Sequence, residues 1–145
     1  MSSTVDVNVL LYASDSSSRF HEGARALLDR LIHGPDLFYL FWPVLMGYLR
    51  IATHPAIFAR PLPPAEAALN VEQLLTLPHA RTAGEDEGFW ELYRATTSGV
   101  PVRGNLVPDA HLVALMRQHG VTTVWTSDRD FRKFDGIEAR DPYAR

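Results

Sequence analysis

The sequence contains no cysteine, and this absence removes several classes of protein at once. A disulfide-stapled scaffold, a thiol nucleophile and a cysteine-ligated zinc site are all excluded. The chain also lacks the ~20 continuous apolar residues of a membrane-spanning helix, because its longest apolar run, 37–48, is interrupted by Pro43 and Gly47. Its first residues carry no positively charged, apolar leader. We therefore expect a cytoplasmic protein without a membrane segment.

Positive charge is also scarce: 14 Lys and Arg stand against 17 Asp and Glu, which gives a formal net charge of −3 at pH 7. This balance argues against a polybasic chain that holds nucleic acid by overall charge, although a local basic rim is compatible with it. Apolar residues, in contrast, make up 46% of the 145 positions, which suits a folded domain with a buried core. No linker or repeat divides the chain, so we expect one domain over residues 1–145.

Short β-like runs alternate with helical patterns along the chain. The expected strands lie at 4–5, 37–41, 79–83, 121–126 and 137–139, and the expected helices at 20–32, 43–55, 65–75, 85–98 and 108–119. This alternation predicts an α/β fold of βαβ units around a mostly parallel sheet. In such a sheet, ligands bind beyond the carboxyl ends of the strands. Apolar neighbours also place Trp42 and Trp125 in the predicted core.

Acidic residues stand at the ends of the predicted strands and at the start of one helix. Asp6 follows the first strand, Asp128 and Asp130 follow the strand at 121–126, and Asp109 opens the helix at 108–119. Carboxylates gathered at one sheet edge repel one another, and a bound Mg²⁺ or Mn²⁺ would supply the missing counter-charge. Such an ion favours hydrolysis of phosphodiester bonds.

Each acid also has an ordinary structural interpretation. Asp109 lies where a carboxylate favours the helix dipole, so it could serve as a capping residue. Asp128 and Asp130 could be turn residues after a strand. Asp6 is harder to explain in this way, because a charge inside an apolar run is costly unless it is paired. The hypothesis of a metal site therefore depends on the whole set of acids.

Four segments of the chain resemble one known family. Residues 5–13 (VDVNVLLYA) resemble the opening of PIN-domain nucleases, in particular VapC-type toxins of toxin–antitoxin pairs. Residues 103–112 (RGNLVPDAHL) resemble the segment that holds their third acid, and residues 126–131 (TSDRDF) resemble their closing segment. Residues 49–55 (LRIATHP) resemble a segment of the mycobacterial-type branch. The four segments occur in the family's order over nearly the whole chain.

This resemblance implies a fold and a function. The fold would be a PIN-like three-layer sandwich with a small, mostly parallel central sheet flanked by helices. The function would be that of an endoribonuclease toxin that uses Mg²⁺ or Mn²⁺, cuts cellular RNA such as tRNA or rRNA, forms a homodimer and is inhibited by a cognate antitoxin. Carried over by position, the catalytic and metal-binding acids would be Asp6, Asp109 and Asp128, with Asp130 as a further metal ligand. Asn8 and Thr126 would orient these carboxylates.

Basic residues near the predicted site are candidates for RNA phosphate contacts. The candidates in the segment at 103–112, and in or just after the segment at 126–131, are Arg103, Arg129, Arg132 and Lys133. Arg50, in the segment at 49–55, is a further candidate. A basic rim beside an acidic centre suits an RNA-cutting enzyme. The alternative is that these are ordinary surface residues.

Gly47 departs from the family pattern. Many members have a glutamate at this position of the second helix, and glycine supplies no ligand oxygen. Glycine inside a helix costs about 1 kcal/mol relative to alanine, so close packing is one explanation for it. The departure keeps a second hypothesis open, a PIN-like module that binds RNA or protein without cutting. A phosphatase or receiver-like domain that uses Asp6 ranks lower, because the first strand is not followed by an Asp-x-Asp pair.

Overall fold

A parallel sheet of five strands forms the centre of the computed structural model, which describes residues 2–144. The strands lie side by side in the order β3-β2-β1-β4-β5, and every neighbouring pair is parallel. Their bounds are β1 Ser2–Val5, β2 Leu37–Phe41, β3 Ala80–Ala83, β4 Thr123–Trp125 and β5 Glu138–Arg140. This arrangement confirms the predicted α/β class, and the sheet is entirely parallel.

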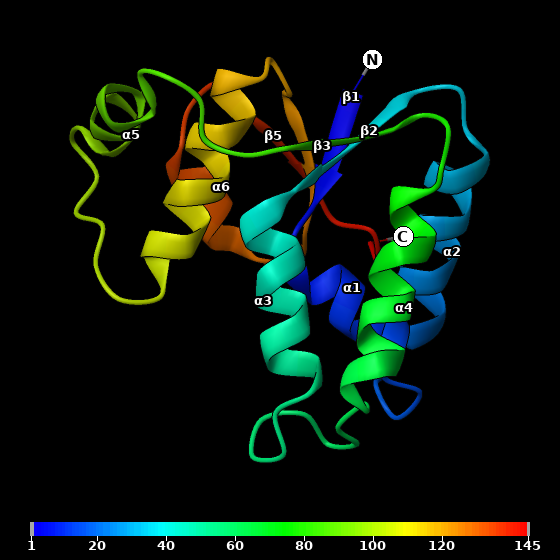
Figure 1. Ribbon diagram of the computed structural model, residues 1–145. Helices are drawn as coiled ribbons and strands as arrows, with labels where there is room; N and C mark the ends of the chain where they lie inside the picture. The colour runs from blue at the N-terminus through cyan, green and yellow to red at the C-terminus, as the bar shows by residue number, and fades with distance from the viewer. Residues whose placement is uncertain (1, 145) are drawn as a thin grey trace.

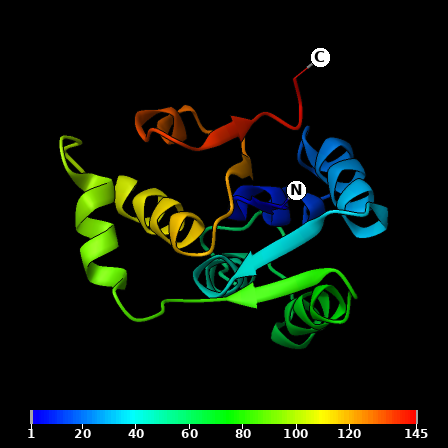
Figure 2. The same cartoon turned by 90° about the horizontal axis from the view of Figure 1, so that it is seen from above.

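Helices cover both sides of the sheet, as a parallel sheet requires. The helices are α1 Val7–Ser14, α2 His21–His33, α3 Trp42–Ala52, α4 Pro64–Leu75, α5 Phe89–Thr97 and α6 Leu106–Gln118. In Figures 1 and 2, α5 and α6 lie on one side and α2 and α4 on the other, while α1 and α3 continue from the carboxyl ends of β1 and β2. None of the helices within residues 2–144 has the length and apolar character needed to cross a membrane.

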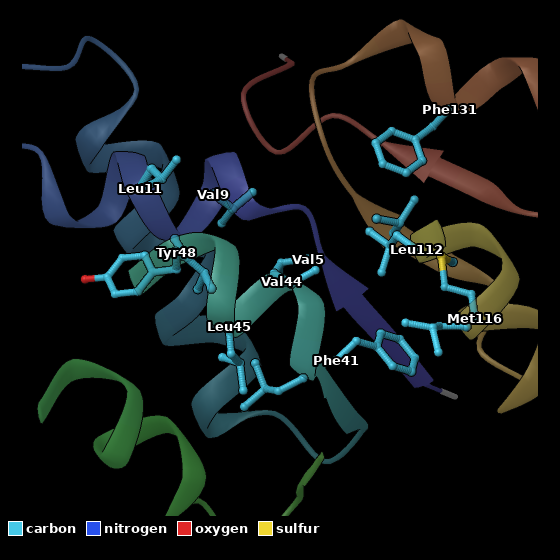
Figure 3. Packing of buried hydrophobic residues seen from close by; sticks show 14 of the residues in the cluster. Val5, Val9, Leu11, Phe41, Val44, Leu45, Tyr48, Leu112, Met116 and Phe131 are labelled. Carbon is cyan, nitrogen blue, oxygen red and sulfur yellow. The ribbon is translucent and has the colours of Figure 1, made fainter. Parts of the chain in front are cut away.

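The core lies where the central strands meet the helices. Val5, Phe38 and Phe41 of β1 and β2 are fully buried, since both faces of these strands are covered. Figure 3 shows Val44 on the α3 side of this core and Met116 on the α6 side. The uninterrupted apolar run in β2 is therefore the sequence signature of a strand buried on both faces.

The strand register brings two distant segments together at the carboxyl edge. Val5 in β1 lies opposite Trp125 in β4. One residue later, the backbone N–H of Asp6 donates to the carbonyl of Trp125 at 3.1 Å. Asp6 and Thr126 thus leave neighbouring strands at the same level, which places the first acid beside the segment that carries Asp128.

Some predicted elements differ from the structure. The sequence predicts no helix at 7–14, yet α1 occupies this segment; three consecutive residues, Val9, Leu10 and Leu11, are buried, so its apolar pattern has no helical period. Helix α5 begins at Phe89 instead of 85, after Gly88 at φ +83°. The prediction of a buried Trp42 is wrong, because this side chain is 40% exposed.

Candidate functional site

A cleft of about 750 Å³ opens at the carboxyl edge of the sheet, between α3 and the start of α6. All four acids that the sequence singled out line it. The lining residues that matter below are Asp6, Asn8, Met46, Gly47, Arg50, Asn105, Val107, Asp109, His111, Asp128 and Asp130. Its position beyond the strand ends is where a parallel sheet binds its ligands.

Thr126 links the first acid to the last acidic segment. Its hydroxyl donates to Oδ2 of Asp6 at 3.0 Å and accepts the backbone N–H of Asp128 at 3.0 Å. Asp6 is only 6% exposed, and this burial raises the pKa of its carboxyl, with a smaller upward contribution from Asp128. The Thr126 hydroxyl lowers the pKa of Asp6 and partly offsets the burial. Thr126 therefore fixes the orientation of Asp6 relative to the segment after β4.

Asp109 lies in the first turn of α6, where the helix dipole favours a negative charge. The carboxyl is half-buried, and burial is the largest of the effects that raise its pKa to about 7. The neighbouring charges of Asp128, Asp6 and Asp130 raise it further, while Lys133 lowers it. Without a counter-ion, this group therefore binds a proton near neutral pH.

The tightest group of carboxylates comprises Asp109, Asp128 and Asp130. One oxygen from each lies within 4.8 Å of the other two. Asp128 caps a short 3₁₀-helix, η1 (Arg129–Lys133), by accepting the backbone N–H of Asp130 at 2.9 Å. Asp6 lies outside this group of three, although it lines the same cleft. The structure thus brings all four predicted acids to one cleft and includes Asp130 in the tightest group.

The other predicted site residues take more varied positions. Asn8 lines the cleft, but within residues 2–144 its side chain makes no hydrogen bond to any of the acids. The predicted RNA contacts, which are Arg103, Arg129, Arg132 and Lys133, are exposed and lie outside the cleft lining. Lys133 forms an ion pair with Oδ1 of Asp130 at 3.1 Å. Lys133 therefore borders the site, and none of the four lines the cleft.

Gly47 is not required by packing, contrary to one explanation from the sequence. A Cβ added there would meet only Cγ2 of Val7, at an ordinary contact distance of 3.7 Å. Its backbone is not in the left-handed region either. Gly47 therefore leaves open space on the α3 wall of the cleft, where the family pattern would place a carboxylate.

Sequence reasoning gave no site role to two residues of the cleft wall, Asn105 and His111. His111 Nε2 lies 2.5 Å from Oε1 of Glu85, and its ring packs 5.4 Å from that of Phe89. Helical spacing separates His111 from Asp109, yet the cleft wraps around the start of α6 and reaches both. Periodicity along one helix carries no information about the shape of a cleft, so the sequence offered no signal for Asn105 and His111.

Comparisons with known proteins agree with this arrangement. The PIN domain family model matches residues 4–137. Ribonuclease VapC48 of Mycobacterium tuberculosis is 54% identical over 144 residues, which cover 99% of each chain.

Two solved structures share the fold at low sequence identity. The crystal structure of M. tuberculosis VapC20, a sarcin-ricin loop cleaving toxin, has a TM-score of 0.71 at 17% identity and covers 96% of this chain and 99% of its own. A toxin–antitoxin complex from Klebsiella pneumoniae has a TM-score of 0.63 at 17% identity, with 99% of both chains covered. Together with the family match and the 54% identity over nearly the full length, these results mean that the chain belongs to the PIN-domain family, within its VapC ribonucleases.

Proposed function

We propose that this protein is a metal-dependent endoribonuclease that hydrolyses phosphodiester bonds of cellular RNA, with tRNA or rRNA as its target class. The observation that carries the proposal is the convergence of four aspartates on one cleft at the carboxyl edge of the sheet. A relative that is 54% identical bears the name ribonuclease, which supports the same activity here. The single domain over residues 1–145 would act as the toxin of a toxin–antitoxin pair.

The donor set fits Mg²⁺ or Mn²⁺. Hard divalent cations prefer oxygen ligands, and the cleft offers carboxylate oxygens from Asp109, Asp128 and Asp130 within 4.8 Å of one another. The raised pKa of Asp109 supports the same interpretation, because burial and its acidic neighbours disfavour its negative charge more than Lys133 offsets. We infer that these three residues and Asp6 hold the ion.

The chain's own residues would prepare the site in three ways. Thr126 fixes Asp6 and the Asp128 backbone relative to each other, so that these groups need no reorganisation when substrate arrives. The start of α6 holds Asp109, and the cap of η1 holds Asp128. When bound, the ion lowers the pKa of a water molecule and neutralises charge on the phosphate. We expect products with 5′-phosphate and 3′-hydroxyl ends.

We also infer contacts outside the acidic centre. The exposed Arg103, Arg129, Arg132 and Lys133 would contact RNA phosphates at the rim, and a cognate antitoxin would block the site. The toxin–antitoxin complex from Klebsiella pneumoniae supports such a partner through its shared fold. A homodimer in the cytoplasm is part of the same proposal.

Cleavage of total cellular RNA by the purified chain tests this function. Reactions with Mg²⁺, Mn²⁺ or EDTA are compared, and new 5′ ends are sequenced. Replacing Asp6 with Asn should abolish both cleavage and growth inhibition while the fold is retained. Asp135→Asn, which alters an exposed aspartate outside the cleft, is the matched control and should cut normally. A toxic Asp6→Asn protein would contradict the assignment.

Gly47 favours a second candidate, a PIN-like module that binds RNA or protein without cutting it. The open α3 wall lacks the carboxylate that the family pattern places there. Four aspartates remain in the cleft, and for this reason we favour catalysis. RNA that is bound but uncut in every metal would reverse this preference.

A further inference from the structure

Arg50 is a cation on the wall of an otherwise acidic cleft. It lies near the end of α3 and is the sole Arg or Lys among the described residues that line the cleft. Its side chain is exposed, and within residues 2–144 it forms no ion pair or hydrogen bond with another side chain. Lys133, in contrast, is already paired with Asp130 at 3.1 Å. Arg50 therefore presents a free guanidinium group towards the site.

The absence of a side chain at Gly47 keeps this guanidinium free. Gly47 lies three residues before Arg50, at the spacing where an acidic side chain on a helix would pair with a following arginine. The space beside it is open, since only Val7 would touch an added Cβ. The residue that departs from the family pattern thus changes the α3 wall from acidic to cationic.

The chemistry of this wall fits a nucleic acid strand. A guanidinium group is planar and donates two parallel hydrogen bonds to phosphate oxygens. Met46 and Val107 line the same cleft and are 49% and 42% exposed, so they offer apolar surface to a ribose or base. A strand whose scissile phosphate lies at the aspartates can place a neighbouring phosphate at Arg50.

We propose that Arg50, with the space left by Gly47, forms a binding subsite for an RNA phosphate next to the scissile one. This inference rests on the proposed ribonuclease function and adds a substrate contact that the acids themselves cannot make. Arg50 differs from the predicted rim contacts at 103, 129, 132 and 133, because it lines the cleft and they do not. It is a substrate-positioning residue, so its loss should weaken RNA binding without altering the metal ligands.

Fluorescence anisotropy with a labelled pool of single-stranded RNA tests the subsite. The full chain is titrated in Ca²⁺, an oxygen-seeking cation that fills the acidic centre, and a gel after each titration checks that the RNA is intact. Arg50→Gln should raise the Kd by about 10- to 100-fold. It should also reduce the slope of log K against log salt by about 0.7, the share of one phosphate contact on a single strand.

Two further variants separate this subsite from general charge. Arg50→Lys should restore the salt slope but only part of the affinity, because an ammonium group lacks the two-pronged geometry. Arg60→Gln removes the same charge from an exposed arginine outside the cleft and should leave Kd and slope at wild-type values. Thermal unfolding of each variant checks the fold.

Several outcomes would overturn the inference. An unchanged RNA affinity in Arg50→Gln would contradict the subsite. An equal loss of RNA affinity in Arg60→Gln would show that only overall charge matters. Intact RNA binding together with lost binding of an antitoxin would assign Arg50 to protein recognition instead. A Mn²⁺ titration keeps the two proposals apart: if the wild-type chain binds neither Mn²⁺ nor RNA, the ribonuclease proposal itself fails.

Discussion

At the scale of single residues, Asp109 shows how strongly the acids act on one another. Its pKa is raised to about 7 in the folded, metal-free chain, against 3.8 for an unperturbed aspartate. The folded state therefore binds more protons than the unfolded state between these values, so its stability falls as pH rises through this window. The stabilising contribution is complete below pH 3.8 and is lost as pH passes 7.

This dependence of stability on pH leads to a prediction for Asp109→Asn in EDTA. At pH 8 to 9 the variant should be more stable than the wild type, on the order of 1–2 kcal/mol once solvent screening of this half-buried group is allowed for. Near pH 4 the difference should vanish. Thermal denaturation across pH measures it, and parallel curves for the two proteins would contradict the raised pKa.

Gly47 gives a second residue-scale prediction. Gly47→Glu adds a carboxylate to open space on the cleft wall, so Mn²⁺ should bind more tightly, on the order of tenfold. Gly47→Gln has nearly the same size without the charge and serves as the control. Isothermal titration of Mn²⁺ into the three proteins decides the question. Equal affinities would mean that position 47 does not reach the ion.

At the scale of elements, Tyr48 connects three helices through one hydroxyl. It lies in α3, contacts Ser14 Oγ of α1 at 2.7 Å, and accepts the amide of Asn70 in α4 at 2.9 Å. The side chain is only 3% exposed, so the loss of its hydroxyl leaves two polar groups without their partner. This contact holds α3, and with it the cleft wall, against the rest of the fold.

Tyr48→Phe should therefore reduce the free energy of unfolding by about 1–3 kcal/mol. Tyr39→Phe is the matched control, because within residues 2–144 the Tyr39 hydroxyl has no hydrogen-bond partner, and it should change stability by less than about 0.5 kcal/mol. Urea denaturation measures both. Similar free energies of unfolding for the two variants would show that the hydroxyl of Tyr48 contributes little to stability.

The elements also show what the sequence can and cannot predict. Strand β2 matches its prediction residue for residue, because an apolar, aromatic run between a Gly-Pro-Asp segment and a proline that opens a helix is typical of a buried strand. Helix α1 was missed because burial on several sides erases its period. Trp42 was misplaced because apolar neighbours in sequence do not show which side of α3 faces solvent. The acids could be predicted as a set, since each follows a strand or opens a helix.

The detailed geometry of the site required the fold. Residues 6 and 126 meet through the register of β1 against β4, which no local pattern encodes. The close position of Asp130 depends on the turn of η1, and the role of Gly47 depends on which neighbours surround it. These features arise from contacts between distant segments, so one sequence alone could not specify them.

At the scale of the whole molecule, the cleft should couple metal binding to stability. An ion held by the carboxylates after β1, in α6 and at the start of η1 would bind only the folded chain, since these three segments are far apart in sequence. Mn²⁺ at a hundredfold excess over its Kd should add about 2.7 kcal/mol to the free energy of unfolding. Differential scanning fluorimetry with and without EDTA measures the shift. If EDTA changes the melting temperature and added Mn²⁺ does not, the site holds a different ion.

The pairing of β1 with β4 also has a consequence in time. Asp6 is synthesised 120 residues before Thr126, whose hydroxyl joins its carboxylate to the backbone of Asp128. The carboxylates cannot assemble before the segment after β4 has been made. The proposed nuclease would therefore stay inactive while the ribosome synthesises everything between β1 and β4. A ribosome that stalls before residue 128 would leave a fragment without Asp128 and Asp130, two of the four aspartates of the cleft.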